Sequence, residues 1–203
     1  MLLEVQEITK SFGSRQVLDG LSFAVDSGEA VGLLGANGAG KTTLLRIVNR
    51  ILLPDEGVVL FDGHPMDSRD LDAVGYLPEE RGLYRRAAAG EQVCYLARLK
   101  GMTKIDAEAS AREWFERLGV AEWWNRPVGK LSKGMQQKVQ FIATVVHRPR
   151  LLVLDEPFSG FDADNSLMLK QQLMRLKASG TGILFSTHNL QAASEMCDKT
   201  VQL

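Results

Sequence analysis

The sequence predicts an α/β domain with a mainly parallel sheet, an antiparallel β unit near the N-terminus and an inserted helical region. AVGLLG (30–35), the start of LLVLDEP (151–157) and the centre of TGILFSTH (181–188) are apolar throughout. Such runs are typical of strands that are covered on both faces. An amphipathic helix expected over 165–180 connects the last two runs, which is the pattern of parallel strands joined by a crossover helix.

The N-terminal region predicts half-buried antiparallel strands. LEVQEITKSF (3–12) and QVLDGLSFAV (16–25) alternate apolar and polar residues, as expected for strands with one buried face. After the apolar strand, the apolar residues of LLRIVNRIL (44–52) recur at helical spacing and predict a helix. A further short strand is expected at VVLF (58–61), between turn-forming residues.

The middle of the chain predicts helices instead of strands. Helices are expected at GEQVCYLARLKGM (90–102), at DAEASAREWFERLGV (106–120) and after LSKGM (131–135). Trp114, Phe115 and Leu118 are expected to pack in a core. We interpret the chain as one domain of three parts: a β subdomain with the first part of the core (1–84), a helical subdomain (85–147) and the rest of the core (148–203).

Composition narrows the possible binding partners. The 203 residues include 24 Lys and Arg against 25 Asp and Glu, a net charge of -1, so no overall field attracts nucleic acid. Cys94 and Cys197 lack metal-ligand spacing and are interpreted as packed thiols in a reducing compartment. No run approaches the ~20 apolar residues of a membrane span, and the N-terminus lacks signal-peptide features. We expect a soluble, cytosolic chain.

The loop GANGAGKT (35–42) matches G-x-x-x-x-G-K-[ST] in full, between an expected buried strand and an expected helix. Backbone N–H groups of such a loop surround a phosphate chain at a helix N-terminus. Lys41 is expected to reach the β and γ phosphates and Thr42 to bind Mg²⁺. The alternative, a glycine-rich turn that caps a helix, does not need this order of residues. The expected phosphate-contacting residues are Gly35, Asn37, Gly38, Ala39, Gly40, Lys41, Thr42 and Thr43.

Acidic residues and a histidine end two other expected strands. Asp155 lies where a carboxylate can hold Mg²⁺, and Glu156 beside it can polarise an attacking water. His188 closes the third parallel strand at the same edge of the sheet, where ligands of open α/β sheets bind. By themselves, adjacent acids can be surface charge and a lone histidine can be structural; the phosphate loop favours the functional interpretation.

Together these residues resemble the ATP-binding subunits of ABC transporters, and the resemblance covers essentially the whole chain. Walker A alone is shared with kinases, GTPases and helicases, whereas a signature shortly before Walker B is specific to this family. The resemblance implies a RecA-like P-loop NTPase core that binds ATP and Mg²⁺. In chain order, the matching features are Phe12 as the aromatic that stacks on adenine, GANGAGKT as Walker A, YLPEERGLY at the Q-loop, LSKGMQ at the signature, LLVLDEP as Walker B, SGFD as the D-loop and His188 as the H-loop switch.

The resemblance also implies partners. In the family two such domains face each other head to tail, and each ATP lies between Walker A of one and the signature of the other. Ser132 is then an N-cap that can bond its own helix or the partner's phosphate, Gly134 clears space, and Asp162 communicates across the dimer. The alternative for the signature is an ordinary capped helix. The second subunit is a copy or a homologue, and the pair binds a transmembrane permease on the cytoplasmic face of the cell membrane.

Three departures from the family pattern stand out. Lys133 and Met135 replace a Gly and a Gln of the commonest signature, L-S-G-G-Q; Lys133 either adds charge near the partner's phosphates or points to solvent. Glu79 replaces the Q-loop Gln, which keeps an oxygen for Mg²⁺ but loses a donor and adds negative charge. We expect a competent but retuned site. The chain stops at TVQL, just inside an expected strand where family members run on, so we expect a truncated sequence.

Three functions remain open at this stage. YLPEERGLY with LSKGMQQKV resembles the branch that pairs with ABC-2 type export permeases, with the helical subdomain and the segment from Glu79 to Tyr84 carrying the conformational change to the membrane partner. The first alternative is a nucleotide-binding regulatory switch of low turnover. The second is a soluble ABC ATPase that acts on DNA or the ribosome, although the nearly neutral net charge gives no sign of a basic surface for nucleic acid.

Overall fold

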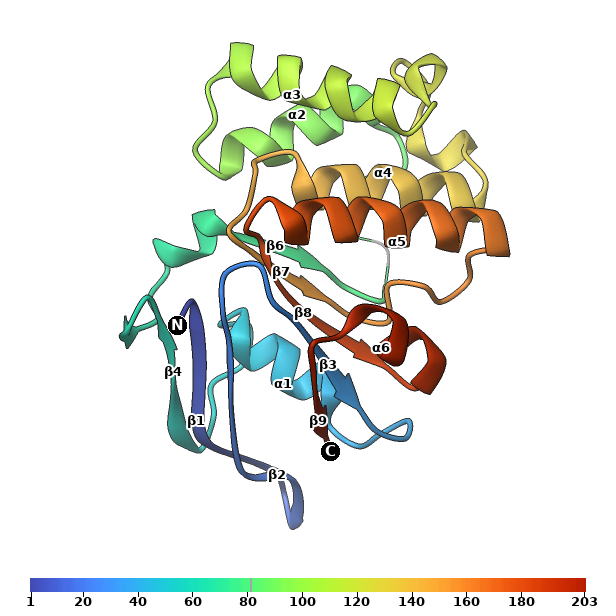
Figure 1. Cartoon of the computed structure of the whole chain (residues 1–203). Helices are drawn as coiled ribbons and strands as arrows, with labels where there is room; N and C mark the ends of the chain where they lie inside the picture. Colours follow the sequence, from blue (N-terminus) through green and yellow to red (C-terminus); the bar gives the residue numbers. More distant parts are fainter. Residues whose placement is uncertain (81) are drawn as a thin grey trace.

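The computed structural model describes residues 1–80 and 82–203, without the side chains of Leu190 and Ala192. A parallel sheet forms its centre, and all neighbouring strands in that sheet run in the same direction (Figure 1). The α/β prediction with a mainly parallel sheet is confirmed. The order across the sheet is β6 (Val74–Leu77), β7 (Leu151–Leu154), β8 (Gly182–Thr187), β3 (Ala30–Leu34) and β9 (Lys199–Gln202).

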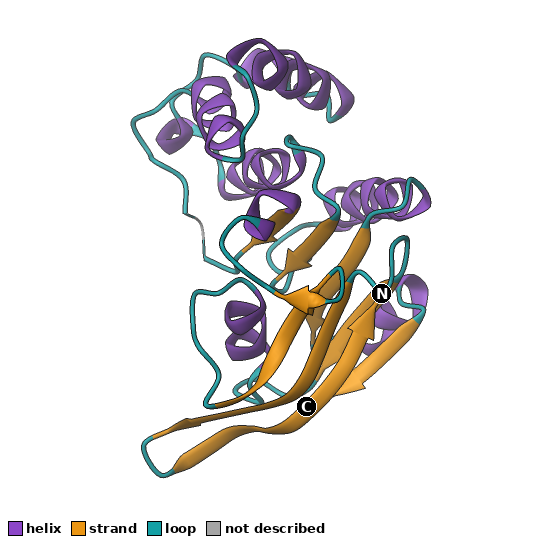
Figure 2. Cartoon of the chain, turned by 90° about the vertical axis from the view of Figure 1, so that its left-hand side faces the viewer, coloured by secondary structure: helices purple, strands orange, loops and turns teal. Residues whose placement is uncertain are grey.

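An antiparallel sheet lies beside the parallel one (Figure 2). The strand at 3–12 pairs antiparallel with the strand at 15–25 on one side and with the strand at 56–61 on the other. The predicted N-terminal antiparallel strands and the short strand at 58–61 are therefore confirmed. The order is β2 (Arg15–Val25), β1 (Leu3–Phe12), β4 (Glu56–Phe61) and β5 (His64–Pro65).

The predicted helices all form, with ends shifted by a few residues. The α-helices are α1 (Lys41–Val48), α2 (Ala89–Leu99), α3 (Lys104–Arg117), α4 (Lys133–Val145), α5 (Ala163–Ala178) and α6 (Leu190–Met196). Short 3-10 helices lie at Asp70–Ala73, Ala121–Trp123 and Val128–Lys130. Helix α5 connects β7 to the adjacent parallel strand β8, which confirms the predicted crossover. None of the described helices is long and apolar enough to cross a membrane.

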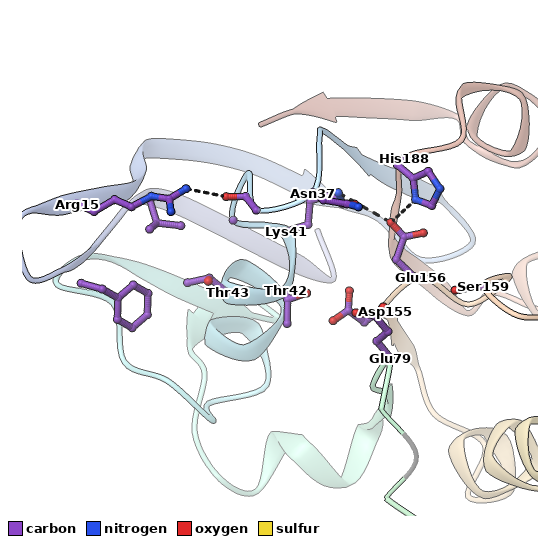
Figure 3. Close-up of a pocket in the computed structure, with 14 residues that line it drawn as sticks. Arg15, Asn37, Lys41, Thr42, Thr43, Glu79, Asp155, Glu156, Ser159 and His188 are labelled. Carbon is purple, nitrogen blue, oxygen red and sulfur yellow. Dashed lines mark hydrogen bonds and ion pairs between the residues drawn. The ribbon is translucent and has the colours of Figure 1, made fainter.

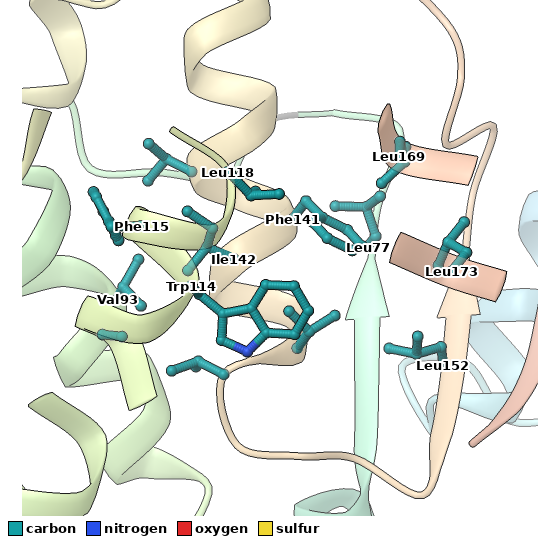
Figure 4. Close-up of a cluster of buried hydrophobic side chains, with 14 of the residues drawn as sticks. Leu77, Val93, Trp114, Phe115, Leu118, Phe141, Ile142, Leu152, Leu169 and Leu173 are labelled. Atoms are coloured by element: carbon teal, nitrogen blue, oxygen red, sulfur yellow. The ribbon is translucent and has the colours of Figure 1, made fainter. Parts of the chain in front are cut away.

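Strands β3 and β7 and the first four residues of β8 are apolar throughout because alternate residues face two different cores. Leu152 and Phe185 belong to a cluster with residues of helices α2 to α5 (Figure 4). Leu151 and Leu184 belong to a second cluster with α1 and the antiparallel sheet. Side chains alternate between the faces of a strand, so a strand covered on both faces has no polar positions.

Helices α2, α3 and α4 share their core with the parallel sheet. Trp114, Phe115 and Leu118 of the α3 region are buried, as predicted. The Trp114 ring meets Phe141 of α4 edge-on, with centroids 5.9 Å apart. Phe141 belongs to the same cluster as Leu152 of the sheet (Figure 4), so α4 is continuous with the core.

Helix α1 ends earlier than the predicted run 44–52. It stops at Val48 because Arg50 takes a left-handed conformation (φ 55°), which breaks the helical hydrogen-bond pattern. The Asn49 amide donates to the Leu45 carbonyl at 2.7 Å, and Ile51 is 57% exposed. The predicted last turn is therefore wrong. Ile51 has the spacing of a buried helical residue in the sequence, but it lies outside the helix.

Strand β6, which the sequence analysis did not predict, lies at one edge of the parallel sheet. Its odd-numbered carbonyls face β7: Leu77 accepts from the Asp155 N–H at 2.8 Å. The even-numbered carbonyls point outward, and side chains of α4 and of His147, two residues beyond its end, donate to them. His147, Thr144 and Gln140 lie 3.2, 3.4 and 3.2 Å from the carbonyls of Val74, Tyr76 and Pro78, respectively.

This contact brings the α4 backbone close to the edge strand. A Cβ at Gly75 would lie only 2.4 Å from the Thr144 carbonyl oxygen, so no larger residue fits there without displacing the helix. Edge strands expose unpaired backbone groups that attract other chains. Here α4 covers that edge and satisfies its carbonyls.

The cysteines are free and half-buried. Burial raises the pKa of Cys94, and it raises the pKa of Cys197 to about 11. Both thiols therefore stay protonated at neutral pH, which agrees with their interpretation as packed side chains.

His147 makes the stability of this fold depend on pH. Burial, and then the nearby Lys100 ammonium, lower its pKa from 6.5 to about 4. Below pH 6.5 the unfolded chain takes up a proton that the folded chain does not. The free energy of unfolding should therefore fall as the pH drops from 6.5 towards 4, by on the order of 1–3 kcal/mol from this group.

Urea unfolding at about pH 7.5 and about pH 5 measures this effect, with a His147→Gln variant as the control. The variant should lose less stability than the wild type over this interval, since its side chain does not titrate. Equal losses in the two proteins would show that His147 is not the group responsible.

Candidate functional site

Parallel pairing places the ends of three strands at one edge of the sheet. Leu34 of β3 is in register with Thr187 of β8, and Phe185 of β8 is in register with Leu154 of β7. The residues that follow these strands therefore meet around a cavity of ≈ 470 Å³ (Figure 3). The lining residues are Phe12, Arg15, Val17, Asn37, Gly38, Gly40, Lys41, Thr42, Thr43, Glu79, Asp155, Glu156, Ser159 and His188.

The phosphate loop depends on glycine at two points. Gly38 and Gly40 have φ of 82° and 104°, in the left-handed region that favours glycine. A Cβ at Gly40 would also lie 2.9 Å from a methyl group of Val17 on β2. The loop is therefore pressed against the antiparallel sheet, and its last glycine begins helix α1.

Lys41 is held over this loop. Its ammonium donates to the carbonyls of Gly35 at 2.7 Å and Ala36 at 3.1 Å, and the side chain is 7% exposed. A positive charge is thus fixed beside the N-terminus of α1, where backbone N–H groups also favour an anion. Thr42 and Thr43, the next residues, are half-buried and line the cavity.

Gly35 and Ala39 lie behind the cavity instead of lining it. A Cβ at Gly35 would be 3.1 Å from the Ala39 methyl group, so the two residues pack against each other. Asn37 and Gly38, on the other side of the loop, line the cavity.

Asp155 is 2% exposed, and one of its two carboxylate oxygens is satisfied by the protein. The hydroxyl of Ser186, at the end of β8, donates to Asp155 Oδ1 at 2.6 Å and accepts from the Glu156 N–H at 2.8 Å. Asp155 Oδ2 is buried without a hydrogen-bond partner in the described part of the chain. A buried anionic oxygen needs a positive partner.

These donors fit Mg²⁺. Asp155 Oδ2 has free lone pairs, and the Thr42 hydroxyl and the Glu79 carboxylate line the same cavity (Figure 3). Among the described residues no group of three or more His, Cys, Asp or Glu side chains could hold a metal alone. Mg²⁺ characteristically takes one or two carboxylates and completes its shell with water and phosphate oxygens.

Glu156 lies between two nitrogen groups. Its Oε1 is 3.0 Å from His188 Nδ1 and 3.9 Å from the Lys41 ammonium (Figure 3). Because an ionised carboxylate only accepts, the proton on His188 belongs on Nδ1, facing Glu156. The Glu156 backbone is left-handed (φ 46°), a conformation that costs a non-glycine residue energy and directs this side chain to the cavity.

The turn between β1 and β2 borders the cavity. Phe12 is 50% exposed at the end of β1, with the Lys10 ammonium 5.7 Å from its ring. Arg15, the first residue of β2, donates to the Gly38 carbonyl at 3.3 Å (Figure 3). An aromatic face and a guanidinium thus lie beside the phosphate loop.

Sequence reasoning missed Arg15 and Ser186. A lone arginine in a hairpin carries no local signal for a site 20 or more residues away along the chain. Ser186 had a weak signal, since its side chain belongs to the Ser-Thr-His run that ends β8, but its role is visible only once β7 and β8 are paired.

Besides Gly35 and Ala39, three more predicted site residues lie outside the cavity. Ser132 is the N-cap of α4, as predicted, and its exposed hydroxyl accepts from the Met135 N–H at 3.3 Å. A Cβ at Gly134 would meet nothing within 4 Å. Asp162 is the exposed N-cap of α5 and accepts from the Asn165 N–H at 2.8 Å. These residues can meet another molecule without rearrangement of the fold.

A glycine-rich phosphate loop between a buried strand and a helix, with a buried carboxylate at the end of a nearby parallel strand, defines a P-loop nucleotide-binding domain. Residues 18–159 match the family described as ABC transporter. The chain is 45% identical over 197 residues to YhaQ, an uncharacterised ABC transporter ATP-binding protein of Bacillus subtilis. It belongs to the ABC transporter family of ATP-binding proteins.

Other known proteins agree with this assignment. A solved structure described as the ATP binding subunit of an ABC transporter matches with a TM-score of 0.92 at 31% identity, covering 100% of this chain and 86% of that chain. The Nod factor export ATP-binding protein I of Sinorhizobium fredii is 34% identical over 200 residues. The alignments cover 97% of this chain but only 66% of YhaQ and 58% of the Nod factor protein, less than two thirds of each relative.

Ser186→Ala tests the support of the acid pair. Ser186 is 0% exposed, so the substitution would leave Asp155 Oδ1 and the Glu156 N–H without a hydrogen-bond partner in the protein interior. The free energy of unfolding should therefore fall by about 1–3 kcal/mol. Denaturant unfolding measures the loss. The exposed Ser68→Ala provides the matched control, and a Ser186→Ala variant as stable as this control would contradict the role assigned to the hydroxyl.

Proposed function

We propose that this chain is the ATP-binding and ATP-hydrolysing subunit of an ABC transporter. The observation that carries the proposal is the position of Glu156 at the end of β7, 3.0 Å from His188 and 3.9 Å from Lys41, beside a phosphate loop. A carboxylate placed between an imidazole and a phosphate-binding ammonium is suited to activate water against a terminal phosphate.

Each residue of the cavity has a distinct part in this chemistry. Lys41 and the N–H groups of the loop bind the β and γ phosphates, and Phe12 offers its exposed face to adenine. Glu156 accepts the proton of the attacking water, a role that contributes typically 10²- to 10⁴-fold to a rate. His188 donates from Nδ1 to Glu156, which orients the carboxylate, and in the doubly protonated ring its Nε2–H would donate to the γ-phosphate.

Mg²⁺ would be held by Asp155, Thr42 and Glu79. When bound, it neutralises phosphate charge and thereby helps the terminal phosphate to leave. Ser186 fixes the Asp155 carboxylate through Oδ1, so that Oδ2 remains for the ion. Glu79 supplies a carboxylate in the family's Gln position, which adds negative charge close to the phosphates and is the basis for a retuned site.

A second subunit completes the site in this proposal. Ser132 and Gly134 begin α4 with an exposed hydroxyl and open space, and the N-terminus of a helix favours an anion. The partner's ATP is the anion that this surface would meet, with Asp162 contacting the facing subunit. ATP binding would then close a head-to-tail pair, either of two copies or of this chain with a homologue, and hydrolysis would open it.

The transport partner is a membrane permease, and we propose an exporter of the ABC-2 type on the cytoplasmic face of the membrane. The name of the Nod factor export relative supports this direction. The helical subdomain, residues 85–147, and the segment from Glu79 to Tyr84 would carry the motion to the permease; Arg81 of that segment lies outside the described residues. The three-part division of the domain is proposed on the same basis.

Lys41→Ala tests nucleotide binding. Removal of the ammonium should weaken the affinity for MgATP by at least about tenfold, because a charge-assisted contact to phosphate is lost. Titration with a fluorescent ATP analogue measures the affinity, and circular dichroism confirms the fold. Exposed Lys133→Ala serves as a comparison in the isolated subunit. Unchanged affinity for Lys41→Ala would contradict the assignment of the phosphate loop.

Glu156→Gln tests hydrolysis. The amide keeps the size of the side chain but does not take up the proton, so phosphate release at saturating MgATP should fall by at least about 10²-fold. ATP-dependent dimers should still form, as measured by size-exclusion chromatography with light scattering. Substantial remaining turnover would exclude Glu156 as the base, whereas a wild type that binds ATP and releases no phosphate would identify a regulatory switch.

A further inference from the structure

Two glutamines of α4 contact the loops that bear the site acids. Gln140 is 6% exposed, and its Nε2 lies 3.2 Å from the Pro78 carbonyl and 3.3 Å from the Glu80 carbonyl. One amide thus donates to the backbone on both sides of Glu79. Backbone carbonyls held in this way leave Glu79 little freedom to shift along the cavity wall.

Gln137, one turn earlier on the same face of α4, holds the other loop. Its Nε2 donates to the Ser159 carbonyl at 2.6 Å, and the Ser159 N–H donates to the Glu156 carbonyl at 3.0 Å. The loop that begins with Glu156 is therefore tied to the helix as well. The two loops and α4 together line a cavity of ≈ 180 Å³ adjoining the site.

The contacts that follow Gln140 along the chain fix the position of α4 along β6. Thr144 near the end of α4 and His147 just beyond it reach the carbonyls of Tyr76 and Val74, so the C-terminal part of the helix lies along the edge strand. The close approach at Gly75 prevents the helix from sliding without a clash. A displacement of α4 is thus transmitted to the segment that carries Glu79 instead of being absorbed between them.

We propose that Gln140 is a positioning residue for the nucleotide site: by holding Pro78 and Glu80 it places Glu79 against Asp155 and Thr42, while Gln137 places the loop after Glu156. This inference rests on the proposed function, because Glu79 matters only where MgATP binds. Through these two glutamines, a movement of the N-terminal end of α4, where Ser132 lies, would be transmitted to both acidic loops of the same subunit.

Gln140→Met is the direct test. Methionine has nearly the same length and fills the same space, but it has no N–H donor. The matched control is Gln172→Met on α5: Gln172 is 5% exposed, and its Oε1 has no hydrogen-bond partner within the described residues. If Gln140→Met does not fold, Gln140→Leu also lacks a donor and leaves a smaller apolar side chain in the same place.

Three measurements separate positioning from a purely structural role. Gln140→Met should lower kcat about tenfold with KM for ATP changed less than about twofold, because a small misplacement impairs the reaction more than binding. Amide exchange of residues 76–80 should be faster than in Gln172→Met. In a Glu79→Ala background, Gln140→Met should lower kcat by less than about twofold more, because two residues that act through one contact are not additive.

The opposite results would overturn the inference. These are a kcat for Gln140→Met equal to that of Gln172→Met, or the full tenfold loss persisting in the Glu79→Ala background. If the wild type shows no turnover, the proposed function fails but the positioning is still tested by binding of a fluorescent ATP analogue. Gln140→Met should then need several-fold more Mg²⁺ for half-maximal binding, and an unchanged Mg²⁺ requirement would refute the role of Gln140 independently of hydrolysis.

Discussion

Parallel hydrogen bonding between β3, β8 and β7 determines where a site can exist in this chain. Strands that run in the same direction end at the same edge of the sheet, so the phosphate loop meets the Asp155-Glu156 pair and His188 although both are more than 100 residues further along the chain. The apolar covering of both sheet faces makes this pairing obligatory. A shift of register would bury acids in the core, and the cost of burying unpaired charge excludes it.

Charge balance governs the site itself. Lys41 and Asp155 are both nearly inaccessible to water, which is costly unless each has partners. Backbone carbonyls hold the lysine, Ser186 holds one oxygen of the aspartate, and Glu156 lies between the lysine and His188. The unsatisfied Asp155 Oδ2 and the ammonium of Lys41 then remain for ligands of opposite charge. The same arrangement therefore leaves an unpaired carboxylate oxygen and an ammonium in one cavity, which suits the proposed binding of a cation together with a polyphosphate.

Helix α4 connects this site to the outer surface of the subunit. It covers the edge strand β6, packs through Phe141 into the core of the sheet, and reaches the acidic loops through Gln137 and Gln140. Its first turn, with Ser132, remains exposed. One helix thus contacts both acidic loops, and in the proposed dimer it would offer a mechanical path between the two nucleotides.

The sequence by itself determined those features whose physical causes are local. A phosphate loop needs its glycines and lysine in consecutive order, an N-cap needs Ser132 directly before its helix, and doubly covered strands need uninterrupted apolar runs; all three were predicted. Only the tertiary structure decided the end of α1 at Val48, the edge position of β6, and the roles of Arg15, Ser186 and Gln140. Each of these depends on a contact between segments distant in the chain, and no local pattern of residues records which distant backbone group a hydroxyl, an amide or a guanidinium will meet.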